Sequence, residues 1–108
     1  MGFFDIFKRR PYKLNSLNFV EKAAAEAALQ AAIHFGADNR NLNIERALKD
    51  FRKGALDKDE LTTVIACVAA ALAAMKGSED PDRSSELKNK QITEVSLALA
   101  FKKLHDML

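Results

Sequence analysis

The sequence predicts an all-α protein, and three observations lead to that fold class. Eighteen of the 108 residues are Ala, which favours helix more strongly than any other residue. The chain has only four Gly, two Pro and one Tyr, and it has no Trp. No run of β-branched residues alternates with polar ones, so no segment has the pattern of a strand. We expect a compact bundle of about four helices around a central, buried, Ala-rich helix, preceded by a short amphipathic head.

The expected head, residues 1–13, is apolar at first and basic afterwards. Without it the chain holds thirteen basic and fourteen acidic residues, so the net charge of +2 comes from the head. Pro11 ends any helix there, because proline lacks an amide donor and disfavours helix in the residue before it. Residues 14–108 then form a single helical-bundle domain. The head residues expected to contact a membrane or a partner are Phe3, Phe4, Ile6, Phe7, Lys8, Arg9, Arg10 and Lys13.

The first long helix is predicted over residues 18–35. Asn18 can cap its start, and Glu21, three residues later, completes the pattern of a capping box. A broad face of alanines on this helix would let another helix approach closely. Leu29 and Ile33 point to a different side, so we expect them to contribute to a surface that another protein covers.

A turn is predicted from Ala37 to Asn41, and Asn43 is predicted to cap a short helix that ends at Gly54. Gly54 can adopt the left-handed conformation that ends a helix, and Asp57 with Glu60 forms a capping box for the next one. The polar side of the short helix is predicted to hold Glu45, Arg46, Lys49, Asp50, Arg52 and Lys53.

Every residue from Val64 to Met75 is apolar, so we expect this helix to be enclosed. Its length of about 18 Å is well short of the roughly 30 Å of a bilayer core, which favours a buried helix over a membrane span. The last helix should start near Pro81 or Ser85 and run to the C-terminus, with more apolar residues than one face can bury. The expected oligomer or partner surface comprises Leu29, Ile33, Phe101, Leu104, Met107 and Leu108.

Three side chains could carry chemistry if their helices converged: Cys67, His34 and His105. A Cys–His nucleophile or a metal site is the alternative here, but Cys67 lies within an apolar run and no ligands occur in close-spaced pairs. We therefore expect no enzyme, no metal and no cofactor. A single cysteine excludes an internal disulfide and favours a reducing compartment. The head lacks the pattern of a secretory signal, so the expected location is the cytoplasm.

The sequence favours a non-enzymatic helical interaction module that self-associates or binds a protein partner, as an accessory, adaptor or inhibitor. An alternative is a peripheral adaptor that the head anchors to the anionic inner face of a membrane. In a competing interpretation the phenylalanines of the head cover the open end of the bundle. A second alternative is nucleic-acid binding, for which the basic stripe would be Arg46, Lys49, Arg52 and Lys53.

Overall fold

Five α-helices and two short strands account for most of the part of the chain that the structure, a computed structural model, describes: residues 11–35, 41–77 and 80–108. The elements are β1 (Tyr12–Lys13), a 3-10 helix (Leu14–Ser16), α2 (Phe19–Phe35), α3 (Asn41–Lys53), β2 (Ala55–Leu56), α4 (Lys58–Lys76), α5 (Pro81–Asn89) and α6 (Glu94–Asp106). The all-α prediction is confirmed, with five α-helices in the described residues instead of about four.

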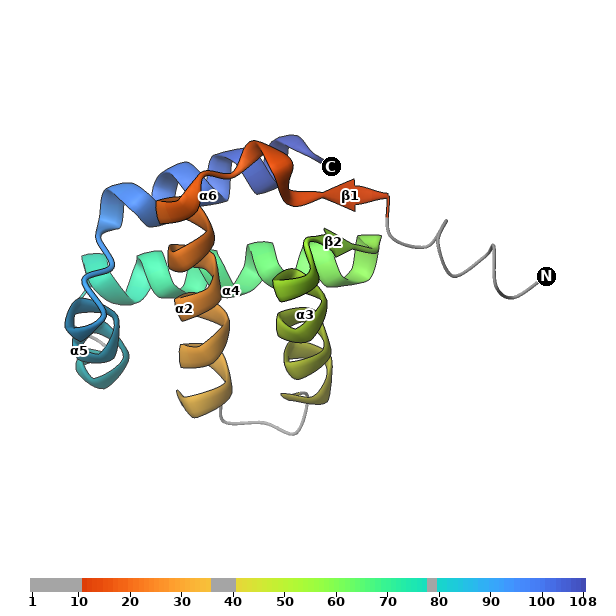
Figure 1. Cartoon of the computed structure of the whole chain (residues 1–108). Coiled ribbons are helices and arrows are strands. Elements are labelled where there is room, and N and C mark those ends of the chain that lie inside the picture. Colours follow the sequence, from red (N-terminus) through yellow and green to blue (C-terminus); the bar gives the residue numbers. More distant parts are fainter. Residues whose placement is uncertain (1–10, 36–40, 78–79) are drawn as a thin grey trace.

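The helices are arranged in two crossing layers. In Figure 1, α2 and α3 lie side by side and α4 passes behind both. α6 runs back along α4 in the opposite direction and forms the upper edge of the molecule in this view. α5 lies at the end where α4 finishes, so that α4 packs against all four other helices.

The start of α2 follows the sequence prediction. The Asn18 side chain accepts a hydrogen bond from the Glu21 amide, and the Asn18 amide donates to the Glu21 carboxylate, both at 2.8 Å. This reciprocal pair satisfies two amides that the first turn of a helix leaves without a partner. The capping box therefore sets the first residue of α2.

The turn between α3 and α4 also follows the prediction. Gly54 has a φ of 95°, which is the left-handed region that a residue with a Cβ adopts only at a cost. Asp57 accepts from the Glu60 amide at 2.7 Å, and its own amide donates to the Glu60 carboxylate at 2.9 Å. The one difference is that α3 begins at Asn41, which was predicted to lie in the preceding turn, so that Asn43 is a residue of the helix and not its cap.

The two strands were not predicted. β1 pairs antiparallel with β2, with Tyr12 opposite Leu56 and Lys13 opposite Ala55. Each strand has only two residues, which is too short for an alternating pattern to show in the sequence. The pairing ties Tyr12 and Lys13 to the helical body, although the sequence assigned them to the head.

The predicted last helix is two helices. Asp80 caps α5 and Pro81 is its first residue, as expected, but α5 ends before a turn in which Gln91 has a φ of 63°. Thr93 then caps α6, and its side chain accepts from the Ser96 amide at 3.1 Å. The sequence did not reveal this break because Gln has no preference for the left-handed region, and because Ser96 stands where a capping box usually has Glu or Gln.

α4 is buried on one side only. Its fully buried side chains include Leu61, Val64, Val68 and Ala71. The exposed side chains of its outer side are Thr62, Ala66, Ala70 and Ala73. The expectation that this apolar helix is enclosed all round is therefore wrong. An alanine exposes little apolar area, so leaving one in contact with water costs much less than exposing a leucine.

Candidate functional site

Two of the six residues of the predicted partner surface lie inside the molecule. Leu29 and Leu104 are fully buried, whereas Leu108 is 57% exposed. Three others, partly buried against the core, are Ile33, Phe101 and Met107. The prediction is wrong for Leu29 and Leu104, which are already covered within one copy of the chain. The reason is that α2 contacts four other helices, so side chains outside its alanine face are covered as well.

The other predicted site, the head, lies almost wholly outside the described residues. The residues concerned are Phe3, Phe4, Ile6, Phe7, Lys8, Arg9 and Arg10. Lys13 is described, and its side chain is exposed on β1. The structure thus places one of the eight head residues that the sequence singled out.

Large exposed apolar side chains of the described residues gather at a place that the sequence did not single out. On the first turn of α2, Phe19 is 86% exposed and Val20 is 58% exposed. On α6, Val95 is 68% exposed and Leu99 is 46% exposed. We refer to these four residues as the α2–α6 patch.

An ion pair brings the two halves of the α2–α6 patch together. The Lys103 ammonium lies 2.8 Å from the carboxylate of Glu21, and it also donates to the carbonyl of Ser16 at 3.1 Å. Glu21 is almost fully buried, and this hydrogen bond from Lys103 is the main cause that lowers its pKa. Because Glu21 follows Val20 and Lys103 lies one helical turn after Leu99, these two apolar side chains flank the same contact.

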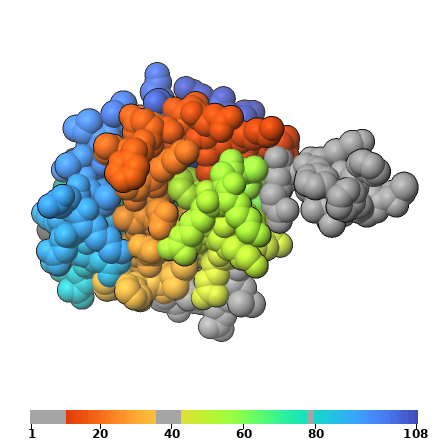
Figure 2. Space-filling view, in the orientation of Figure 1, coloured from red at the N-terminus to blue at the C-terminus, as the bar shows by residue number. Residues whose placement is uncertain are grey.

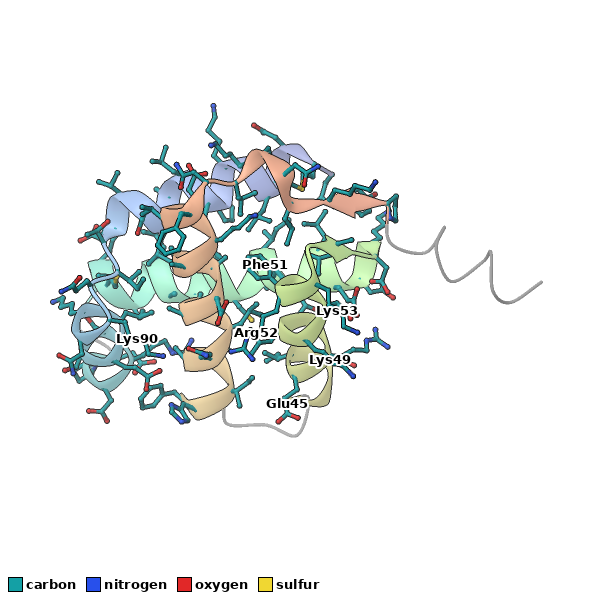
Figure 3. The ribbon with its side chains drawn as sticks, in the orientation of Figure 1. Glu45, Lys49, Phe51, Arg52, Lys53 and Lys90 are labelled. Carbon is teal, nitrogen blue, oxygen red and sulfur yellow. The ribbon has the colours of Figure 1, made fainter. Side chains whose placement is uncertain are left out.

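A hollow of about 440 Å³ extends the patch along α2. Its apolar lining residues are Phe19, Ala23 and Ala27 of α2 and Ile92, which precedes α6. Its polar lining residues are Lys22, Glu26, Gln30 and Lys90. In Figure 2 it lies between the orange α2 and the blue part of the chain, and Figure 3 labels Lys90 on that side.

Two arginines of the basic stripe predicted on α3 lie beside carboxyl groups of other helices. Arg52 projects toward α2 (Figure 3), where its guanidinium lies 3.1 Å from the Glu26 carboxylate. Arg46 lies beside a buried carboxylate of α4, at 3.5 Å. Lys49 and Lys53 remain without an ion pair among the described residues. Lys49 and Lys53 lie one helical turn apart, so the part of the stripe without ion pairs is a pair of neighbouring lysines in place of the four predicted basic residues.

A buried carboxyl pair joins α3 to α4, and the sequence did not predict it. Glu60 is 1% exposed and Asp50 is 3% exposed, although the sequence placed Asp50 on the polar side of its helix. Burial, and next the hydrogen bond between the two side chains, raises the pKa of Glu60 to about 7. Below about pH 7 the pair therefore holds a proton, which lets one carboxyl donate to the other. Helical spacing gave one indication that Asp50 could be buried, because Asp50 follows Ala47 by three residues and so borders the apolar stripe of α3.

The cysteine and the two histidines have different surroundings. Cys67 is buried, and burial raises the pKa of its thiol to about 11, which disfavours the reactive thiolate. His34 is exposed and lies 2.9 Å from the Glu86 carboxylate. His105 stacks on the ring of Phe101. Within residues 11–35, 41–77 and 80–108, no three His, Cys, Asp or Glu side chains form a group that could hold a metal ion.

Comparison with known proteins identifies no relative of this chain. No protein-family model matches the chain, and no curated protein or solved structure matches it either. In the described part of the chain no single helix is long and apolar enough to cross a membrane, and α4 with α5 meets that test only as a pair bent by 100°.

Proposed function

We propose that this protein is a non-enzymatic helical module that binds protein through the α2–α6 patch. The observation that carries the proposal is the placement of exposed apolar side chains. Of the five large apolar side chains that are exposed in the described residues, four belong to this patch, and the fifth is Leu108 at the chain end. The four side chains belong to two helices that the Glu21–Lys103 ion pair joins. Exposed apolar side chains that gather on neighbouring elements mark interaction sites, whereas apolar residues scattered singly over a surface do not.

The surroundings of the patch support this function. Phe19 is a large aromatic side chain that lines the hollow together with Ala23, Ala27 and Ile92, which suits insertion of a partner's apolar side chain beside it. The rim carries both signs of charge, from Lys22, Lys90 and Glu26, which suits the polar edge of a protein interface. The proposed module therefore has an apolar centre and a polar rim.

Site-specific photo-crosslinking tests the proposal. A photo-reactive phenylalanine analogue is placed at Val95, and a matched variant carries it at Lys88, an exposed position on α5. We expect protein adducts from Val95 in the cells that produce the protein, and few or none from Lys88. Equal adduct yields from the two positions would contradict binding through the patch.

A second candidate function, peripheral binding to an anionic membrane, is supported by the sequence of residues 1–10. Three phenylalanines and one isoleucine would insert among lipid tails, and each nearby basic residue would add about 1 kcal/mol next to anionic lipid. We expect co-sedimentation with phosphatidylserine vesicles that is lost when residues 1–10 are deleted. The deletion stops there because Tyr12 and Lys13 pair with β2. Equal vesicle binding by the shortened chain would exclude this function.

A further inference from the structure

The outward side of α6 has an apolar centre between opposite charges. Val95, Ala98 and Leu99 are exposed there, while Leu97 and Leu104 face the core. Positions three and four residues apart share one side of a helix, so the three exposed residues form a continuous strip. α2 and α4 pack against the other side of α6, which leaves the strip at the edge of the molecule (Figure 1).

The charges at the two ends of this strip have no partner within the described chain. Glu94 comes before the strip and Lys102 comes after it, and both are exposed. They lie about 12 Å apart along the helix axis, which is too far for an ion pair between them. Neither forms an ion pair with any other described residue, in contrast to Lys103, which is bonded to Glu21.

A two-fold axis through the middle of the strip matches each of these charges with its opposite. Two antiparallel copies of α6 crossing between Ala98 and Leu99 place these two residues against each other. Lys102 then enters the space between Glu94, Val95 and Ala98 of the partner subunit, with its aliphatic stem on the valine and its ammonium near the carboxylate. The same contact forms twice by symmetry. A parallel pair would instead bring Glu94 near Glu94 and Lys102 near Lys102, so the charge pattern selects the antiparallel arrangement.

We propose that two copies of this chain form a two-fold dimer through antiparallel α6 helices, with Val95, Ala98 and Leu99 at the centre and Glu94–Lys102 ion pairs at both ends. This inference rests on the proposed function and names its partner as a second copy. The flanking ion pairs make the dimer weaker at high salt.

Charge reversal tests the dimer in the full-length protein. Sedimentation equilibrium of the parent chain is compared with that of Glu94→Lys and Lys102→Glu, and circular dichroism checks that each variant is folded. Either single reversal replaces two attractions by two repulsions, so we expect the dissociation constant to rise by about tenfold or more. The control Lys88→Glu changes a charge on α5, outside the strip, and should leave the dissociation constant unchanged.

Two combinations of the charge reversals make the test specific for the antiparallel arrangement. The double variant Glu94→Lys with Lys102→Glu should dimerise like the parent, because both pairs are restored with their signs exchanged. An equimolar mixture of the two single variants should form a heterodimer, because each is repelled by itself and complementary to the other.

Three results would overturn the inference: a parent chain that is monomeric at all concentrations, single reversals that leave the dimer intact, or recombinations that fail to restore it. A monomeric parent that still crosslinks from Val95 to a different protein would remove the dimer and retain the proposed function. A monomer that gives no specific crosslink would remove both.

Discussion

At the scale of single residues, the buried pair of Glu60 and Asp50 is the main electrostatic feature of the core. Glu60 has two roles at once, since it completes the capping box of α4 with Asp57 and shares a hydrogen bond with Asp50 from α3. Two carboxylates in one buried site cannot both ionise without repulsion, so the folded chain retains a proton. The contact that joins these two helices is therefore coupled to pH.

This coupling predicts how stability changes with pH. The pKa of Glu60 is raised from its usual value of 4.5 to about 7 in the folded chain, so the folded state keeps a proton that the unfolded state releases. The contribution of this group is complete below pH 4.5 and is lost as the pH rises to about 7. The free energy of unfolding should fall by roughly 2–3 kcal/mol over that range and then level off.

Glu60→Gln should abolish this dependence. A glutamine keeps an oxygen for the Asp57 amide and donates an N–H to an ionised Asp50, so the variant should be the more stable protein at pH 8. Urea unfolding followed by circular dichroism at several pH values between 5 and 8 measures the effect. Glu45→Gln, which changes an exposed glutamate of α3, is the control and should retain the parent slope. An unchanged slope in Glu60→Gln would mean that another group holds the proton.

At the scale of elements, short-range hydrogen bonds define where most helices begin and end. Reciprocal capping pairs begin α2, α4 and α6, and a glycine with positive φ ends α3. The turn between α5 and α6 is different, because Gln91 has a φ of 63° that glycine would adopt without cost. A residue with a Cβ is destabilised by about 1–2 kcal/mol in this conformation.

Gln91→Gly should therefore stabilise the protein. We expect the free energy of unfolding to rise by about 0.5–1 kcal/mol, because the relief of backbone strain exceeds the greater freedom of glycine in the unfolded chain. The matched change Lys49→Gly, at an exposed position inside α3, should lower it by about 1 kcal/mol. Chemical denaturation of the three proteins measures both effects. If Gln91→Gly were as destabilising as Lys49→Gly, this would contradict the left-handed conformation of Gln91 between α5 and α6.

At the scale of the whole molecule, one ion pair ties the N-terminal segment to the C-terminal helix. Lys103 contacts both Glu21 and the carbonyl of Ser16, which are more than eighty residues away in sequence. The lysine is partly exposed, whereas the carboxylate it neutralises is buried. Removing the cation would leave that buried carboxylate without its counter-charge.

Lys103→Met should consequently lower the melting temperature by several degrees at neutral pH, since methionine keeps much of the side-chain volume but neither the charge nor the donors. The pKa of Glu21 is lowered from 4.5 in the folded chain, so the parent loses the stability that the Glu21–Lys103 ion pair contributes as the pH falls below 4.5. The difference between parent and variant should narrow accordingly in acid. Lys88→Met, at an exposed lysine with no ion pair among the described residues, is the control. Equal melting temperatures for the two variants at neutral pH would show that the contact contributes nothing.

The capping boxes could be predicted from the sequence, but the exposure of one side of α6 could not. Asn18 with Glu21 and Asp57 with Glu60 lie three residues apart, so their capping boxes can be recognised from spacing alone. Helical spacing also allows Val95 and Leu99 to be placed on one side of α6. It does not show that this side faces water, because that depends on which other helices cover the rest of α6.

The all-α class, most helix boundaries and the glycine turn after α3 could be predicted from the sequence, because they depend on residues within about four positions of one another. The pairing of β1 with β2, the burial of Asp50 beside Glu60 and the exposure of the α2–α6 patch could not be predicted in this way. Each depends on contacts between segments far apart in the chain. Four helices around α2 cover Leu29, whereas the open edge of α6 leaves Val95 and Leu99 in contact with water, although all three are apolar residues of amphipathic helices.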